Sequence, residues 1–396
     1  MAIRQKVGAR ILIVAGLLLW LMTPADALAA PVNDVFASAT TITGVSGTVT
    51  GTTVLATREV GEPTHGGVGS GNSVWWKWTP TSTGLATFST ANSASNNVLA
   101  IYTGSAVNAL TAVTLGSGGS QTTNTIAFFA SAGSTYYIAV DGIFGVTGAV
   151  TLTWSQVTPP NSGWWWNPAE PGRGYAIEVT GISPLLTSPR IFFSVFGYDA
   201  TGPALWYIST GLMSSPTSYT GTLDQYSGGQ SLTGTFKPPT RLGSAGTLAL
   251  SFTNQSTGTL TWPGGTVPIQ RYEFTPGGLS LPQVTGAVQT GWWWNPAEPG
   301  RGYFVETQNS SILIGTFMYD TNGRATWFIT QNTVTSAVSY AGRLFEYAGG
   351  QSMFGTFVAP STVIDRGSLS VSFSSTTTGT VTLPSGTQVP ISRFNF

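Results

Sequence analysis

Cysteine is absent from the 396-residue chain, and histidine occurs once, as His65. Without cysteine there is no disulfide framework and no thiolate zinc site, and a lone histidine excludes every multi-histidine metal centre. Charge is scarce too: 8% of the residues are charged, against about 25% in an average soluble domain, and 15 basic residues balance 15 acidic ones. Such a chain lacks the clustered Lys and Arg that binding of nucleic acid requires.

Long hydrophobic runs are missing after the N-terminus. The basic residues Arg4, Lys6 and Arg10 precede the apolar run Ile11–Met22, and Ala27–Ala29 follows with small residues. This order predicts a signal peptide over residues 1–29, cleaved after Ala29. About 12 apolar residues are too few to span ~30 Å of hydrocarbon, and no later run reaches ~18, so no membrane span is expected in the mature chain. We expect an exported protein, extracellular or at the cell surface, with the periplasm left open.

The chain contains an internal repeat. The segment Gly163–Tyr175 (GWWWNPAEPGRGY) recurs unchanged as Gly291–Tyr303. The period of ~120 residues far exceeds the ~20–50 residues of a solenoid repeat, so each copy is predicted to be a domain with its own core. The predicted domains are 30–157, a first Trp-rich unit at 161–274 and a second at 289–396.

Everything after the signal peptide is predicted to be β structure. Val74, Trp76 and Trp78 alternate with more polar neighbours, which is the period of two expected of a strand. Each Trp-rich unit contains about eight short runs of β-branched and aromatic residues separated by turn residues, which predicts an antiparallel β-barrel or meander. In the first unit these runs are Tyr175–Thr180, Arg190–Tyr198, Ala204–Thr210, Tyr219–Asp224, Gly234–Lys237, Thr247–Phe252, Gly258–Trp262 and Val267–Phe274.

Two resemblances refine this all-β assignment. The first unit carries Asn33–Ala37, Ala56–His65, Ser73–Trp78, Tyr102–Gly104 and Tyr136–Gly142 in order. With these motifs it resembles the bacterial pre-peptidase C-terminal (PPC-like) domains that lie beside secreted enzymes and surface proteins. The resemblance implies a jelly-roll-like β-sandwich, often an accessory or binding module, with calcium bound in some members. The repeat resembles a Trp-rich module that occurs in several copies in exported proteobacterial proteins, which bears on location and not on chemistry.

The tryptophan triplets are the first candidate site. Successive side chains of a strand point to opposite faces, so Trp164 and Trp166 share one face and Trp165 takes the other. Some ring surface must therefore meet solvent, a neighbouring domain or a ligand. Flat aromatic rings stack on the apolar faces of sugars, so a glycan or another surface polymer is the expected partner; the alternative is a structural role for the rings. The candidate ligand-binding residues are Trp164, Trp165, Trp166, Arg173 and Tyr175, with Trp292, Trp293, Trp294, Arg301 and Tyr303 in the second copy.

A charged pair is predicted within each repeat. Glu178 lies on an early strand of the first unit and Arg271 on its last strand, as do Glu306 and Arg393 in the second. If each unit is an up-and-down barrel, its first and last strands are neighbours. We therefore expect the pairs Glu178–Arg271 and Glu306–Arg393 across the closure, where a buried pair fixes register.

Carboxylates keep an enzymatic alternative open. Glycoside hydrolysis needs two carboxyl groups, and the matched candidates are Glu170, Glu178 and Asp199, with Glu298, Glu306 and Asp320 in the second copy. A Ser-His-Asp site would need His65, for which a hydrogen-bonding role in its loop is the simpler interpretation. In the first unit, oxygen ligands for calcium are available from Asn33, Asp34, Glu59, Glu62 and Asp141.

The sequence as a whole predicts an exported, non-catalytic binding protein that recognises a glycan or another surface polymer through exposed tryptophan. A secreted hydrolase acting on polysaccharide and a structural surface or matrix protein are the alternatives. No nucleic acid partner is expected, and self-association is left open because uncharged strands can pair edge to edge.

Overall fold

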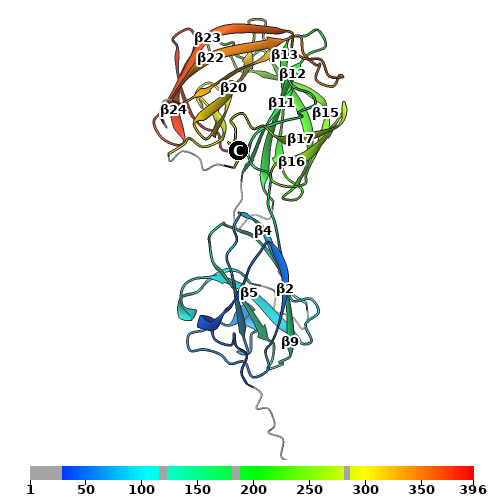
Figure 1. The fold of residues 1–396 in the computed structure, drawn as a ribbon, viewed down its shortest axis with the longest axis vertical. Coiled ribbons are helices and arrows are strands. Elements are labelled where there is room, and N and C mark those ends of the chain that lie inside the picture. Colours follow the sequence, from blue (N-terminus) through cyan, green and yellow to red (C-terminus); the bar gives the residue numbers. More distant parts are fainter. Residues whose placement is uncertain (1–28, 116–122, 181–187, 281–285, 335, 337) are drawn as a thin grey trace, which may run out of the picture.

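A computed structural model of the chain describes residues 29–115, 123–180, 188–280, 286–334, 336 and 338–396. The predicted signal peptide falls almost wholly on residues 1–28, outside this described part, and stays a prediction. Within the described ranges no helix is long and apolar enough to cross a bilayer. Figure 1 shows a β-sandwich at one end of the molecule and two β-barrels packed side by side at the other. The prediction of an all-β fold is confirmed.

The N-terminal unit is a sandwich of two sheets, with strand orders β1-β3-β8-β5-β6 and β2-β9-β4-β7. Its short 3₁₀ helices are η1 (Phe36–Ser38), η2 (His65–Gly67) and η3 (Val107–Ala109). Its strands are β1 (Thr40–Ile42), β2 (Ser46–Thr52), β3 (Val74–Trp78), β4 (Gly84–Ser89), β5 (Asn97–Thr103), β6 (Thr111–Leu115), β7 (Thr125–Ala130), β8 (Tyr136–Gly142) and β9 (Ala149–Val157). Alternate residues of both sheets meet in one core, in which Trp76, Trp78 and Phe88 are buried.

Each repeat forms a closed antiparallel barrel of eight strands, so the predicted barrel is confirmed. The first barrel consists of β10 (Gly163–Trp166), β11 (Gly174–Thr180), β12 (Arg190–Tyr198), β13 (Ala204–Leu212), β14 (Ser218–Ser227), β15 (Thr240–Phe252), β16 (Thr257–Trp262) and β17 (Gly265–Arg271). The second consists of β18 (Gly291–Trp294), β19 (Gly302–Gln308), β20 (Ser311–Tyr319), β21 (Ala325–Thr333), β22 (Ser339–Ala348), β23 (Thr362–Phe373), β24 (Thr378–Thr382) and β25 (Gln388–Arg393).

The set of strands differs from the prediction at two places. The tryptophan triplet itself forms the first strand, β10, whereas Gly234–Lys237 is not a strand. Two prolines, Pro238 and Pro239, follow that segment, and proline cannot donate a hydrogen bond to a sheet. The segment belongs instead to a loop that leaves its own barrel, as described below.

Each barrel closes through a short pairing of its first and last strands. In the first barrel this closing strand pair joins Trp165 to Arg271 and Trp166 to Gln270. The second barrel closes in the same register, with Trp293 opposite Arg393. Because so few residues pair there, the closure needs further support, and that support comes from the other barrel.

The charged pairs form between the barrels and not within them, which corrects the prediction. Arg271 of the first barrel pairs with Glu306 of the second, and Arg393 of the second pairs with Glu178 of the first. The Glu306 carboxylate also accepts a hydrogen bond from the Trp164 N–H at 2.6 Å. Each glutamate therefore binds both strands of the other barrel's closing pair.

The motif begins with glycine because this contact leaves no space for a side chain. Gly163 has a φ of +145°, and a Cβ there would lie 1.6 Å from Arg271 Nη1 and 2.4 Å from Glu306 Oε2. Gly291 has a φ of +135°, and a Cβ there would lie 2.2 Å from Glu178 Oε2. Both positions combine a backbone conformation that favours glycine with a close approach of the exchanged ion pair.

Two loops also cross between the barrels. We call residues 228–236 and 349–357 the exchange loops; each begins with Gly-Gly-Gln-Ser. Met353 of the second loop is buried in the core of the first barrel, and Leu232 of the first loop packs against the core of the second. Backbone bonds fix both loops: Met353 N–H donates to Tyr198 O at 2.8 Å, and Tyr319 N–H donates to Gln230 O at 3.1 Å.

We predict that Glu178 is energetically coupled to Arg393 and not to Arg271. Replacing either Glu178 or Arg393 alone by Ala leaves a buried charge without its partner, so we expect a loss of about 3–5 kcal/mol in the free energy of unfolding. In a double-mutant cycle from urea unfolding, Glu178→Ala with Arg393→Ala should show a coupling of about 1–3 kcal/mol. An equal or larger coupling of Glu178 to Arg271 would contradict the exchanged pairing.

Candidate functional site

The three rings of each tryptophan triplet have three different surroundings. Trp165 and Trp293, the middle rings, lie in the cores of their own barrels and are at most 1% exposed. Trp164 and Trp292, the first rings, are buried between the barrels. Trp166 and Trp294, the third rings, are half-buried. The predicted alternation of faces is therefore observed. The rings that point out of their own barrel are Trp164 and Trp292, which the other barrel buries, and Trp166 and Trp294, which stay half-buried.

The first rings build the inter-barrel interface, the surface through which the two barrels pack. Trp164 lies edge-on to Phe304 of the other barrel, with ring centroids 4.8 Å apart, and its Nε1 donates to Leu313 O at 3.4 Å. Two further indoles donate across the interface: Trp206 Nε1 to Met318 O at 3.0 Å and Trp327 Nε1 to Gly197 O at 2.9 Å. These reciprocal bonds give the interface an approximate twofold symmetry.

The prediction that Trp165, Tyr175, Trp293 and Tyr303 contact a ligand is not supported by their positions. All four side chains point into the barrel cores, and both tyrosines are fully buried. Burial raises the pKa of the Tyr175 hydroxyl and of the Tyr303 hydroxyl to about 12, so neither ionises near neutral pH. These residues stabilise the barrels. The half-buried third rings, Trp166 and Trp294, remain as candidate ligand contacts.

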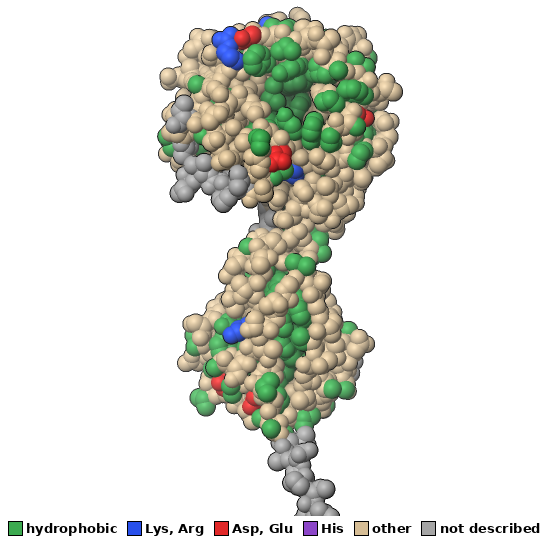
Figure 2. Space-filling view, in the orientation of Figure 1, with side chains coloured by type: hydrophobic (Ala, Val, Ile, Leu, Met, Phe, Trp, Pro, Cys, Tyr) green, Lys and Arg blue, Asp and Glu red, His purple; other side chains and the backbone are tan. Residues whose placement is uncertain are grey.

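Two clefts open at the rim of the inter-barrel interface, one on each side of the approximate twofold axis. The wide cleft has a volume of about 560 Å³ and the narrow cleft about 240 Å³. Figure 2 shows hydrophobic side chains gathered in a hollow of the paired barrels. Both clefts are lined by residues of both barrels, so neither exists in a single repeat.

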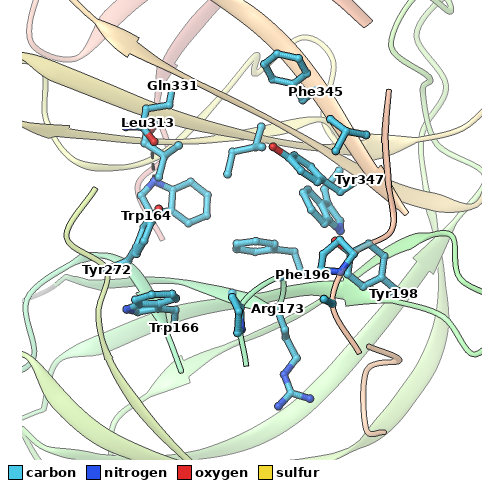
Figure 3. Close-up of a pocket in the computed structure, with 18 of the residues that line it drawn as sticks. Trp164, Trp166, Arg173, Phe196, Tyr198, Tyr272, Leu313, Gln331, Phe345 and Tyr347 are labelled. Atoms are coloured by element: carbon cyan, nitrogen blue, oxygen red, sulfur yellow. Dashed lines mark hydrogen bonds between the residues drawn. The ribbon is translucent and has the colours of Figure 1, made fainter. Parts of the chain in front are cut away.

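Aromatic rings surround the wide cleft. Figure 3 shows Trp164, Trp166 and Tyr272 on one side, Tyr347 on the other and Phe196 between them. Trp166 lies edge-on to Tyr272 with centroids 4.9 Å apart. Tyr347 stacks on Trp327 at 6.0 Å, and its hydroxyl is directed into the cleft in Figure 3. The half-buried rings of Trp166, Tyr272 and Tyr347 thus present flat apolar faces with few polar groups nearby.

The narrow cleft is lined by the equivalent residues of the opposite repeats. Trp294 takes the place of Trp166, Tyr226 that of Tyr347, and Phe394 that of Tyr272. One difference reduces its volume: Phe192 stands where the wide cleft has Leu313. The Phe192 ring packs against Trp292 at 4.8 Å and against the C-terminal Phe394 and Phe396, so aromatic side chains fill space that is open in the wide cleft.

The motif arginines have structural partners. Arg173 donates through Nη1 to Met353 O of the other barrel at 3.1 Å and pairs with Glu170. Its guanidinium lies over the Trp262 ring and points away from the wide cleft in Figure 3. Arg301 pairs with Glu298 at 2.7 Å. Both guanidinium groups fix the turn that follows each triplet, and only the aliphatic parts of these side chains remain for the clefts.

The carboxylates of the hydrolase alternative are all engaged by arginine. Glu170 and Glu298 pair with the motif arginines, and Asp199 and Asp320 share Arg324. Burial raises the pKa of Glu178, against the lowering effect of Arg393 and the Trp292 N–H. A raised carboxyl pKa suits a general acid, but Glu178 lies among the buried contacts of the inter-barrel interface and is absent from the described lining of both clefts.

The candidate calcium ligands of the sandwich form local hydrogen bonds. Asp34 accepts from Thr57 N–H, Glu59 from Phe36 N–H and Asp141 from Asn72 N–H, while Asn33 donates to Trp75 O. Within the described ranges, no group of three or more His, Cys, Asp or Glu side chains has the geometry to hold a metal ion. The sequence signal for calcium, an acid-rich set in a charge-poor domain, is thus accounted for by turn and loop bonding.

His65 belongs to a buried network in the same domain. Its Nε2 lies 2.8 Å from Glu62 Oε1, its Nδ1 lies 2.8 Å from the Tyr102 hydroxyl, and Ser73 donates to Glu62. Burial alone raises the pKa of Glu62, but hydrogen bonds from His65, Ser73 and the Glu59 N–H together hold it below its ordinary value of 4.5. The network stabilises the loop that carries η2, as the simpler interpretation of His65 predicted.

Comparisons with known proteins add no relative: no protein-family model matches the chain, and no curated protein matches it. The resemblances of the first unit and of the repeat therefore stay predictions.

We predict that the sandwich loses stability in acid through Glu62. Because the folded-state pKa is lowered, the ionised carboxylate stabilises the fold above the unfolded-state value of about 4.5, and this contribution is lost as the pH falls through the folded-state pKa. Calorimetry of the full chain should show the sandwich transition shifting to lower temperature below pH 4.5, with a smaller shift in Glu62→Gln. The exposed Glu273→Gln serves as the control, and an unchanged pH dependence in Glu62→Gln would contradict this role.

Proposed function

We propose that the paired barrels are an exported, non-catalytic binding module, and that the wide cleft receives a neutral glycan chain or a similar surface polymer. The observation that carries the proposal is the set of half-buried rings around a cleft of about 560 Å³ that both barrels build together. Ligand sites in proteins are typically ~300–1,000 Å³ in volume, apolar in lining and supplied with a few polar groups.

The chemistry of the lining favours sugar rings. The C–H face of a pyranose is apolar and stacks on an aromatic ring, while its hydroxyl groups hydrogen-bond at the edge. Trp166, Tyr272 and Tyr347 offer faces for stacking. The Tyr347 hydroxyl and the Oε1 of the exposed Gln331, whose Nε2 donates to Phe274 O, offer edge contacts. A Trp or Tyr side chain buries about 150–250 Å² when fully enclosed, and a half-buried ring stacked on one face buries less, so a few rings account for weak to moderate affinity.

The same lining disfavours charged polymers. Arg173 is the charged residue among the described residues that line the wide cleft, and its guanidinium is bound by Glu170 and Met353 O. Binding of nucleic acid or of an acidic polysaccharide draws on several free cationic groups. The ligand class that suits this cleft is therefore uncharged.

We predict that Trp166→Ala and Tyr347→Ala each weaken binding of a neutral polysaccharide by about tenfold, the effect of losing roughly 1.4 kcal/mol of stacking. A panel of soluble neutral polysaccharides is screened by quenching of tryptophan fluorescence, and affinities of the responding ones are measured by calorimetry. A chain that responds to no member of a broad panel contradicts the proposal.

The matched control is Trp294→Ala, which removes the equivalent half-buried ring from the narrow cleft. It should leave the affinity within about twofold of the wild-type value, because an unaffected contact changes binding by less than roughly 0.5 kcal/mol. Equal losses in Trp166→Ala and Trp294→Ala would point to an effect on the inter-barrel interface and not to ligand contact in the wide cleft.

A separate assay for reducing ends, run on the polysaccharides that bind, addresses the hydrolase alternative. Release of reducing ends from a bound polysaccharide that is abolished in a Glu178→Gln, Glu306→Gln variant would favour an enzyme. Export through the signal peptide and the PPC-like character of the sandwich belong to this proposal as well, and they place the ligand outside the cytoplasm.

A further inference from the structure

The surface that joins the two barrels is self-complementary. Its two ion pairs and two of its indole hydrogen bonds are reciprocal: Glu178 pairs with Arg393 and Glu306 with Arg271, and Trp206 donates to Met318 O as Trp327 does to Gly197 O. The bond from Trp164 Nε1 to Leu313 O has no such counterpart. The exchange loops also make reciprocal contacts: Ser352 forms a β-bridge with Tyr198, and Ser231 forms the equivalent β-bridge with Tyr319. An interface in which the same patch serves both partners is the kind that joins two copies of one subunit.

The residues that make these reciprocal contacts are largely the same in the two repeats. The triplet, the glutamate and arginine of the ion pairs, the interface indoles and the Gly-Gly-Gln-Ser segments are the same in both copies. The barrel interiors are identical at some positions, such as Tyr175 and Tyr303, and differ at others, such as Phe193 and Ile314. Since each barrel presents the same joining residues, the first barrel of one chain fits the second barrel of another chain as it fits its own.

The link between the barrels does not restrict the pairing to one chain. Residues 272–290 join Arg271 of β17 to Gly291 of β18. Tyr272 and Phe274 bond to Gln308, and Val288 is buried in the second core, so the 13 residues between Phe274 and Val288 set a maximum reach of ~43 Å at ~3.3 Å per residue. A tether of this kind sets an effective concentration in the millimolar range at most, so a high local concentration of other chains competes with it. Chains gathered on a surface meet that condition.

We propose that a second copy of this chain is a binding partner, and that two chains associate by exchanging their second barrels. In the exchanged dimer, Glu178 of each chain pairs with Arg393 of the other, and each exchange loop fills the barrel end of the other chain. No new contact is needed, because every contact is already present within one chain. An assembly of this kind holds four clefts, so it would raise the avidity for a repeating polymer.

Two variants of the full chain make the exchange measurable. Arg393→Met leaves Glu178 buried without its cation, and Glu178→Gln leaves Arg393 without its anion while keeping an oxygen for the Trp292 N–H. When the two variants are mixed, exchange of second barrels reunites Glu178 with Arg393 in one barrel pair. The other pair then contains the uncharged Gln and Met, so no buried charge is left alone in either.

The variants carry different tags, are unfolded in urea and are refolded together or separately, and their masses are measured by light scattering after size exclusion. We expect the mixture to contain a one-to-one heterodimer of twice the monomer mass, roughly tenfold more abundant than dimer in either variant alone. Wild-type chain refolded at rising concentration should show a growing dimer fraction.

A chain with both substitutions, Glu178→Gln and Arg393→Met, is the control, because it has no lone charge and should show the same proportions of monomer and dimer as the wild type at each concentration. If mixing gives only monomers or aggregates and the wild type stays monomeric at every concentration, the proposal is wrong. A dimer that forms equally well from either variant alone, without mixing, contradicts exchange at this interface. These measurements involve no ligand, so their outcome is independent of the polymer proposed for the wide cleft.

Discussion

The exchanged contact between a glutamate of one barrel and the closing strand pair of the other is the interaction on which the structure depends. In the first barrel, β10 and β17 pair over only two residue positions. Glu306 binds the Trp164 N–H of β10 and the Arg271 guanidinium of β17, so a residue of the second barrel holds the first barrel closed. A buried ion pair is seldom a large net source of stability, but it fixes which strands meet and in which register. Here it makes the closure of each barrel conditional on the presence of the other.

This dependence gives a physical reason for the identity of the motif in both copies. Many residues of a barrel core pack within their own repeat, and some of these positions differ between the copies, as Phe193 and Ile314 illustrate. A residue at the inter-barrel interface faces the other repeat, and a change in one copy must suit the unchanged copy opposite. Trp206 and Trp327, each donating to a carbonyl of the opposite barrel, are constrained in this way.

The sequence predicted the barrels, their closure and the division of the tryptophan rings between two faces, because each of these follows from local alternation and strand count. It could not assign the ion pairs. Arg271 and Arg393 occupy equivalent positions in the two repeats, so either could pair with Glu178. Nothing in the local sequence tells which of the two arginines is its partner. The strand content of Gly234–Lys237 was mispredicted because Thr235 and Phe236 favour a strand, whereas the segment is largely exposed and ends a loop whose Leu232 packs against the other barrel.

The two clefts differ because residues at the rim of the inter-barrel interface are less constrained by the opposite barrel than residues at its centre. Residues at its rim face solvent on one side, so they can change without disturbing the partner repeat. Leu313 at the wide cleft corresponds to Phe192 at the narrow one, and Phe345 corresponds to Asp224. One side thus has an open aromatic cleft, while the other is narrowed by Phe192, whose ring packs against Trp292, Phe394 and Phe396. A symmetric interface therefore produced two unequal surfaces, and the wide one keeps three half-buried rings available because neither barrel has the side chains to cover them.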